Sequence, residues 1–209
     1  IFKSLSNILE ERAQLAPGFR VLEVNAGLFQ DAGSTLVEEL GFGLSAAVEY
    51  MDRLTDLCND PSVVAGAMQF NFCVGANYFM EIAKLRAARI LWKRICVAYG
   101  IPEDQHYMPI HTSRAEWKLT LYDPHVNMLR GTTEAMSAIL GGADSLTVRT
   151  YDHPYGQASA FSERIARNTQ IILKEEAYFN KVIDPAAGSY YIESLTDGMI
   201  REAWALFQS

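Results

Sequence analysis

The chain has 209 residues, of which 49% are hydrophobic and 21% charged, as is typical of a globular protein with a buried core. Its net charge of -7, with Lys and Arg scattered singly, excludes nucleic acid and anionic membranes as partners. No apolar run approaches the roughly 20 residues that cross a bilayer, and no signal-peptide pattern opens the chain. The cysteines, Cys58, Cys73 and Cys96, lie far apart without a CxxC pair. We therefore predict reduced thiols in a cytoplasmic protein, and no metal site.

Short β-rich runs alternate with long helical patterns in the first half of the chain, which is typical of βα units on a parallel sheet. The first predicted strand is Phe19–Asn25, and its helix is predicted to begin at an Asp31 N-cap and to reach Met51. The second strand, Met68–Val74, is almost entirely apolar or amide, as expected of a strand buried on both faces. In the helix Tyr78–Tyr99, we predict an inner stripe of Phe79, Ile82, Leu85, Ala88 and Trp92, with Lys84, Arg89 and Lys93 pointing outward.

The second half continues the pattern. The third strand is predicted at His106–Thr112, with a helix over Pro124–Leu140 that stops at Gly141-Gly142, and the fourth strand at Ser145–Thr150. Two further helices are predicted at Ser159–Phe179 and Leu195–Phe207, the second after a turn at Asp184-Pro185. No linker interrupts the chain, so a single domain over residues 1–209 is expected.

Four βα units are compatible with a small open sheet and with half of an eight-stranded barrel. A full barrel typically needs about 250 residues, so this chain would supply only one half. Half a barrel leaves two strand edges and, we expect, an apolar inner face that needs cover. This argues for the other half of the barrel or a partner chain.

An ordered set of segments resembles the cobalamin-dependent acyl-CoA mutases, the methylmalonyl-CoA mutase family, over nearly the whole chain. In that family an eight-stranded βα barrel encloses the CoA substrate, and a separate domain carries cobalamin. The resemblance implies an α/β fold that is the C-terminal half of a TIM-type (β/α)8 barrel: four parallel βα units plus terminal helices. The segments are Asn77–Ala87, Glu134-Ala135-Met136, Gly141-Gly142, Ser145-Leu146, Ser162–Gln170 and Asp184–Tyr190.

The positions that carry chemistry in the family are changed here. Active members have a Tyr-His pair before Gln-Glu-Ala-Gly, where the imidazole polarises the thioester and the tyrosine steers the radical. This sequence keeps the landmark as Gln30–Gly33, but the pair before it reads Gly27-Leu28. Leu28 has no hydrogen-bond donor, and losing such a donor typically costs a few kcal/mol of barrier or more.

Other family positions depart in the same direction. The Arg and Ser that hold CoA correspond to Ala67 and Gln69, and the family's His-x-Gln before Thr-Ser reads Pro109-Ile110-His111. Three polar residues that meet the substrate and the adenosyl ribose correspond to Asp144, Arg149 and His153, and no DxHxxG cobalamin motif is present. The resemblance therefore implies no catalytic, cofactor-binding or metal-binding residues in this chain. In this respect the chain is similar to the small subunit of heterodimeric mutases, and this similarity implies a large-subunit partner that carries adenosylcobalamin.

Several polar residues have simpler interpretations than a site. His111 at a strand end fits a general base by position, but no second base stands near it in the sequence, so we favour a structural role. His106 and His125 are expected in a loop and at a helix start. Arg164 and Arg167 lie on one helical face, where a salt bridge to Asp184 or Glu175 is favoured over a phosphate clamp. Asp152–Gly156 is expected to be a turn.

Three hypotheses follow from the sequence. The first is a non-catalytic small subunit that stabilises the large subunit interconverting methylmalonyl-CoA and succinyl-CoA. The second is a divergent but active acyl-CoA mutase, an isomerase that uses shifted residues such as His111, Arg149 and His153. The third, weaker hypothesis is self-association of two halves into a closed barrel.

Overall fold

The computed structural model describes residues 1–209 and contains one sheet of four parallel strands in the order β1-β2-β3-β4. Consecutive strands are neighbours and helices connect them, so the α/β class and the parallel βα units are confirmed. Strands β1 and β4 form open edges of the sheet, and closure into a barrel stays a prediction. The strands are β1 (Leu22–Asn25), β2 (Met68–Val74), β3 (Ile110–Arg114) and β4 (Ser145–Thr147).

Only β2 has the bounds predicted for it. Strand β3 begins later than predicted because Glu103–Gln105 forms a 3-10 turn and Pro109 has no N–H to donate to a ladder. Strand β4 ends after Thr147, since it has a single neighbour and its pairing with β3 stops there.

Eight α-helices accompany the sheet. Three of them, Phe2–Leu15, Gly27–Asp31 and Pro61–Gly66, were not predicted, and the last helix of the chain begins five residues before the predicted start, at Tyr190 rather than Leu195. The helices are α1 (Phe2–Leu15), α2 (Gly27–Asp31), α3 (Leu36–Cys58), α4 (Pro61–Gly66), α5 (Tyr78–Ala98), α6 (Val126–Leu140), α7 (Ala160–Glu175) and α8 (Tyr190–Gln208). None of them combines the length and hydropathy needed to cross a membrane.

The starts of two helices differ from expectation. Asp31 ends α2 rather than capping the long helix; α3 is capped by Thr35, whose side chain and that of Glu38 form a capping box. Pro124 lies before α6, whose N-cap is His125. The stop after α6 is as predicted, because Gly142 adopts a left-handed conformation with φ of 84°.

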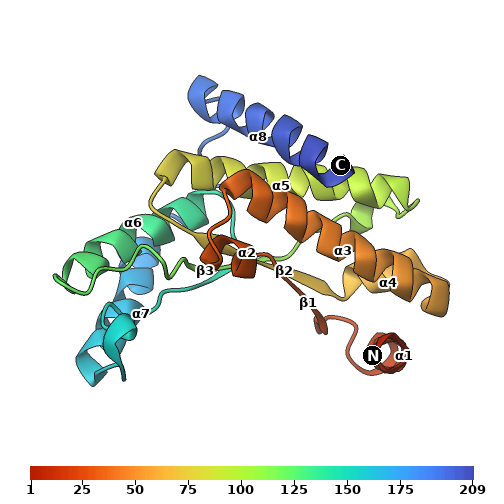
Figure 1. The fold of residues 1–209 in the computed structure, drawn as a ribbon, viewed down its shortest axis with the longest axis horizontal. Coiled ribbons are helices and arrows are strands. Elements are labelled where there is room, and N and C mark those ends of the chain that lie inside the picture. Colours follow the sequence, from red (N-terminus) through yellow and green to blue (C-terminus); the bar gives the residue numbers. More distant parts are fainter.

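Helices α3, α5 and α6 cover one face of the sheet, and α8 lies outside α3 and α5 as a further layer (Figure 1). The apolar side chains of the strands point toward these helices; Phe70, for example, packs edge-on against Trp92 with the ring centroids 4.8 Å apart. The main core lies between the sheet and helices α3 and α5, and it continues between these two helices and α8.

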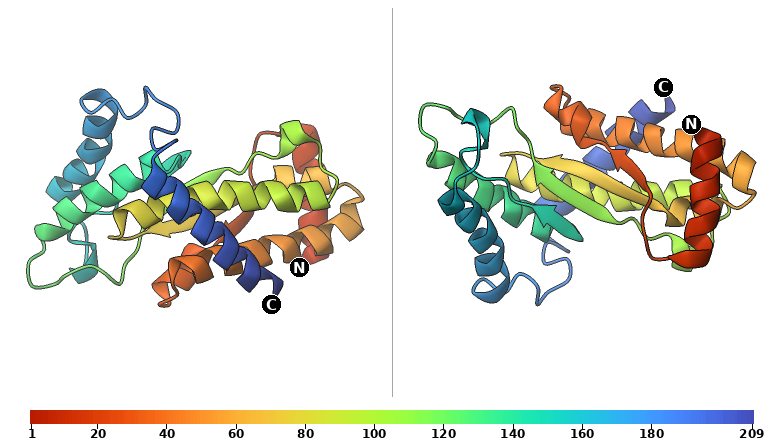
Figure 2. Two further views of the ribbon diagram at one scale, coloured as in Figure 1. Left: turned by 90° about the horizontal axis from the view of Figure 1, so that it is seen from above. Right: turned by 90° about the horizontal axis from the view of Figure 1, so that it is seen from below.

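The opposite face of the sheet is open and polar, so the prediction of an apolar inner face is wrong. Seen from below, this face has α1 and α7 at its borders and no helix lying across it (Figure 2). Strict alternation along the strands sends their apolar residues to the helices and leaves polar residues on the other side. The residues on the open face include Glu23, Asn25, Gln69, Asn71, His111, Ser113, Ser145 and Thr147.

Candidate functional site

A hollow of about 290 Å³ lies on the open face, toward the carboxyl ends of the strands. This is the end at which βα barrels place their active sites. The hollow brings together all four strands, helix α2 and the segment after β4. Its lining residues are Glu23, Asn25, Gly27, Leu28, Asp31, Asn71, Phe72, Cys73, His111, Ser113, Thr147 and Arg149.

The structure brings some of the family positions into this hollow and leaves others out. Gly27 and Leu28 line it, with Leu28 64% exposed. Ala67 is fully buried before β2, whereas Asp144 lies at the other end of the sheet, where it accepts hydrogen bonds from Ile110 N at 2.7 Å and from Arg89 at 2.9 Å. Asp144 therefore has a structural role in placing β3 and α5.

His111 lies inside the hollow, and both of its ring nitrogens are engaged. Nδ1 is 2.8 Å from the Ser145 hydroxyl and Nε2 is 3.1 Å from the Thr147 hydroxyl. Burial lowers the pKa of His111, opposed by the charge of Glu23. The His111 ring on β3 is thus held by two hydroxyls of β4, and the structural role favoured from the sequence stays a prediction.

Arg149 is the one Lys or Arg side chain that lines the hollow, and Glu116 neutralises it in an ion pair. His153 lies beside the pair, 3.3 Å from Arg149 and 3.4 Å from Glu116. The backbone N–H of Glu116 donates to Asp31 Oδ1 at 2.9 Å. The segment after β3 is thus fastened across the rim to α2 and to the segment after β4.

A buried cluster of charges supports the hollow from behind, and the sequence pattern missed it. Lys84 was predicted to point outward, but it is fully buried, with its Nζ 2.5 Å from Glu39 and 2.7 Å from Glu81. Burial raises the pKa of Glu39 to about 7 against the opposing charge of Lys84. The pKa of Lys84 is raised, because the two carboxylates outweigh the opposing effect of burial.

This cluster holds the backbone at the end of β2. Cys73 N donates to Glu39 at 2.8 Å, Cys73 O accepts from Lys84 Nζ at 2.6 Å, and Gly75 N donates to Glu81 at 2.7 Å. The Glu-x-x-Lys spacing on α5 was a signal that could have been used, since residues three apart face each other on a helix.

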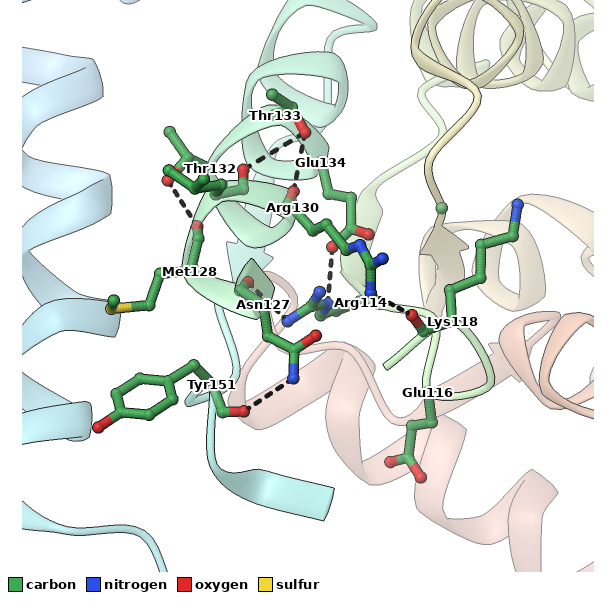
Figure 3. Close-up of polar contacts among 12 residues, drawn as sticks. Arg114, Glu116, Lys118, Asn127, Met128, Arg130, Thr132, Thr133, Glu134 and Tyr151 are labelled. Atoms are coloured by element: carbon green, nitrogen blue, oxygen red, sulfur yellow. Dashed lines mark hydrogen bonds and ion pairs between the residues drawn. The ribbon is translucent and has the colours of Figure 1, made fainter. Parts of the chain in front are cut away.

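A second buried pair connects β3 to α6 (Figure 3). Arg114 Nε lies 2.7 Å from Glu134 Oε2, and Arg114 Nη1 donates to the backbone carbonyl of Asn127 at 3.1 Å. The Asn127 side chain accepts from Thr120 N and donates to the carbonyls of Thr120 and Tyr151. Asn127 therefore ties both segments that follow β3 and β4 to the first turn of α6.

Other predicted contacts are corrected by the structure. Asp184 pairs with Arg86, not with Arg164 or Arg167, and Glu175 pairs with Lys174. Arg164 instead lies over the ring of Phe161. Phe79 is 49% exposed and packs against Tyr191, so it is not part of the inner stripe, whereas Ile82, Leu85, Ala88 and Trp92 are buried as predicted. Asp152–Gly156 forms a turn, with a 3-10 segment at His153–Tyr155.

The remaining histidines make local contacts. His106 lies 2.7 Å from the carbonyl of Ile101, and His125 stacks against Tyr151 with centroids 5.3 Å apart. No group of three or more His, Cys, Asp or Glu side chains is arranged to hold a metal ion.

Comparison with known proteins relates this chain to a family. The methylmalonyl-CoA mutase family model matches residues 1–209. The chain is 50% identical to the methylmalonyl-CoA mutase small subunit of Porphyromonas gingivalis, over 95% of this chain and 32% of that protein. It is 40% identical to the small subunit of Streptomyces virginiae, over 99% of this chain and 33% of that protein. Identity to the Porphyromonas gingivalis large subunit is 37%, over 98% of this chain and 29% of that protein.

The chain thus spans about a third of the length of the curated relatives it matches. Its parallel βα units, its ordered segments and the match along its whole length agree: this chain belongs to the methylmalonyl-CoA mutase family.

Proposed function

We propose that this chain belongs to a non-catalytic small subunit of a methylmalonyl-CoA mutase, which supports a large subunit that interconverts methylmalonyl-CoA and succinyl-CoA. The observation that carries the proposal is the pair Gly27-Leu28 in the wall of the hollow. The family has a tyrosine and a histidine at these two positions. This chain has no side chain at the first and an isobutyl group at the second. An oxyanion formed there would find no donor from either residue.

The charges of the hollow support the same conclusion. Glu23 and Asp31 are acidic lining residues, and Arg149 is already paired with Glu116. A carboxylate-bearing acyl-CoA would therefore meet no free guanidinium or ammonium in the hollow, while the acidic groups would repel it.

The family is cobalamin-dependent, and we propose that the partner large subunit carries the adenosylcobalamin. The side chains of this chain do not fit a cobalt ligand site. His106, His111 and His153 use ring nitrogens within the chain, and His125 stacks on Tyr151. We infer further that residues 1–209 form one domain, the second half of the barrel, and that the protein is cytoplasmic.

The relatives support a two-subunit arrangement, because Porphyromonas gingivalis has both a small and a large subunit that resemble this chain. The greater identity is to the small subunit, 50% against 37%. The polar open face argues against two copies closing on each other, because many polar groups would be buried without matched partners.

The test uses the full-length protein that contains this chain, purified alone and with its large subunit. We expect no isomerisation of methylmalonyl-CoA by the protein alone with adenosylcobalamin added, and turnover when the large subunit is present. Turnover by the protein alone would overturn the proposal in favour of the divergent mutase that uses His111, Arg149 and His153. A calorimetric titration with several acyl-CoAs checks the same point, because the active alternative requires binding.

A further inference from the structure

Gly27 lies in the wall of the hollow at a point where the chain has no room for a side chain. A Cβ built on Gly27 would lie 2.7 Å from Cys73 Sγ and 3.2 Å from Cys73 N. Its φ angle is not among the positive ones, so the backbone conformation there is open to any residue. The constraint on position 27 is therefore space, which Cys73 occupies.

Cys73 is held in this place from behind. Its N–H and its carbonyl bond to Glu39 and Lys84, two side chains that are fully buried. These bonds fix the backbone at the end of β2, so the residue cannot withdraw from α2 without breaking a buried, charged network.

The thiol itself is enclosed. Cys73 Sγ lies 3.6 Å from Gly27 O, 3.8 Å from Asp31 Oδ2 and 3.9 Å from Ser113 Oγ. Burial, reinforced by the charges of Asp31 and Glu39, raises the pKa of Cys73 to about 12, so the group stays a neutral thiol that packs as a small apolar side chain.

We infer that Cys73 is a fixed plug in the wall of the hollow, which excludes any side chain from position 27 and so prevents a substrate-facing group from being placed there. This deepens the proposed function and rests on it in taking position 27 as substrate-facing. The loss of the family's ring and the presence of the thiol are then coupled, since position 27 cannot take a side chain while the thiol lies beside it.

The test is a double-mutant cycle in urea unfolding with Gly27→Ala, Cys73→Ala and the double variant. Alanine in the first turn of a helix normally favours folding over glycine, so only the clash predicts the opposite sign. We expect Gly27→Ala to lower the urea unfolding midpoint by roughly 0.5–1 M. In the Cys73→Ala background, the same substitution should lower the midpoint by less than half as much. Gly198→Ala in α8 is the matched control: nothing lies within 4 Å of its Cβ, and it should not lower the midpoint in either background.

Equal loss from Gly27→Ala in both backgrounds, or no loss in either, would overturn the inference. If Gly27→Ala does not fold but the double variant does, the result supports the role of the Cys73 thiol. If neither variant folds, the backbone of Cys73 and not its thiol excludes a side chain at position 27, and the inference is overturned. None of these unfolding measurements depends on turnover, so the isomerisation assay tests the proposed function independently of them.

Discussion

Glu134 is a residue whose charge depends on the fold, and it makes stability depend on pH. Burial raises its pKa to about 7, against the opposing charge of Arg114. The folded state thus keeps this proton at pH values where the unfolded state, with the ordinary value of 4.5, has released it. The stability from this group is full below about pH 4.5 and is lost as the pH rises to about 7.

We expect the urea midpoint to fall between about pH 5 and about pH 8, with a contribution from Glu134 on the order of 2 kcal/mol. Glu39 has a similarly raised pKa and keeps its own contribution, whereas Glu134→Gln removes that of Glu134, so the midpoint of this variant should be lower overall and its slope over this range smaller. The matched control, Glu49→Gln on the exposed face of α3, should keep the wild-type slope. An unchanged slope in Glu134→Gln would contradict the assignment.

The burial of the charged residues behind the hollow could not be predicted from the sequence pattern. Periodicity assigned Ile82, Leu85, Ala88 and Trp92 correctly to the buried stripe, because their spacing matches one face of a helix. It placed Lys84 in solvent because a charged residue beside such a stripe usually is. Helix α5 is instead covered by α3, α6 and α8 as well, and only tertiary contacts of that kind show that two carboxylates compensate the buried ammonium.

Asn127 links two elements of the fold, because its side chain bonds to both segments that follow β3 and β4. Asn127 is 1% exposed, and its amide makes hydrogen bonds of 3.0 to 3.2 Å to Thr120 and Tyr151. The sequence predicted the strand and the helix on either side of the segment after β3 but gave no sign of what orders that segment, because the hydrogen-bond partners of Asn127 come from two separate segments.

We expect Asn127→Ala to destabilise the protein by about 2 kcal/mol, because partly buried backbone groups at Thr120 and Tyr151 lose their partners. Limited proteolysis should then cleave the segment between Glu116 and Asp123 sooner than in the unaltered protein. Thr133→Ala, which removes an exposed hydroxyl bonded only to its own helix, serves as the control and should change neither property. Unchanged cleavage in Asn127→Ala would contradict the role of this amide.

At the scale of the whole molecule, the sequence predicted the parallel βα units but not the character of the free face. Alternation was read as uniform burial because β2 is rich in apolar residues, and the amides of Gln69 and Asn71 were counted as buried with them. The structure separates the two faces, with the side chains of Met68, Phe70 and Phe72 toward the helices and the two amides toward the open face. The family resemblance identified Gly27-Leu28, whereas only the structure shows that the Cys73 thiol fills the space beside Gly27.

Helix α8 forms an outer layer that packs on α3 and α5 and so links distant parts of the chain. Met199, Ile200 and Ala203 are buried where α8 crosses α3 and α5, and a Cβ on Gly41 would lie 3.0 Å from Leu206 (Figure 1). Because this contact has so little free space, a charge placed in it must either be buried without a partner or displace the helix. We expect Met199→Lys to cost about 2–5 kcal/mol and to expose α8 to proteolysis before global unfolding. Asp197→Lys places the same charge on the exposed face of α8 and should leave the urea midpoint close to that of the unaltered protein; equal effects of both substitutions would show that α8 adds no stabilising layer.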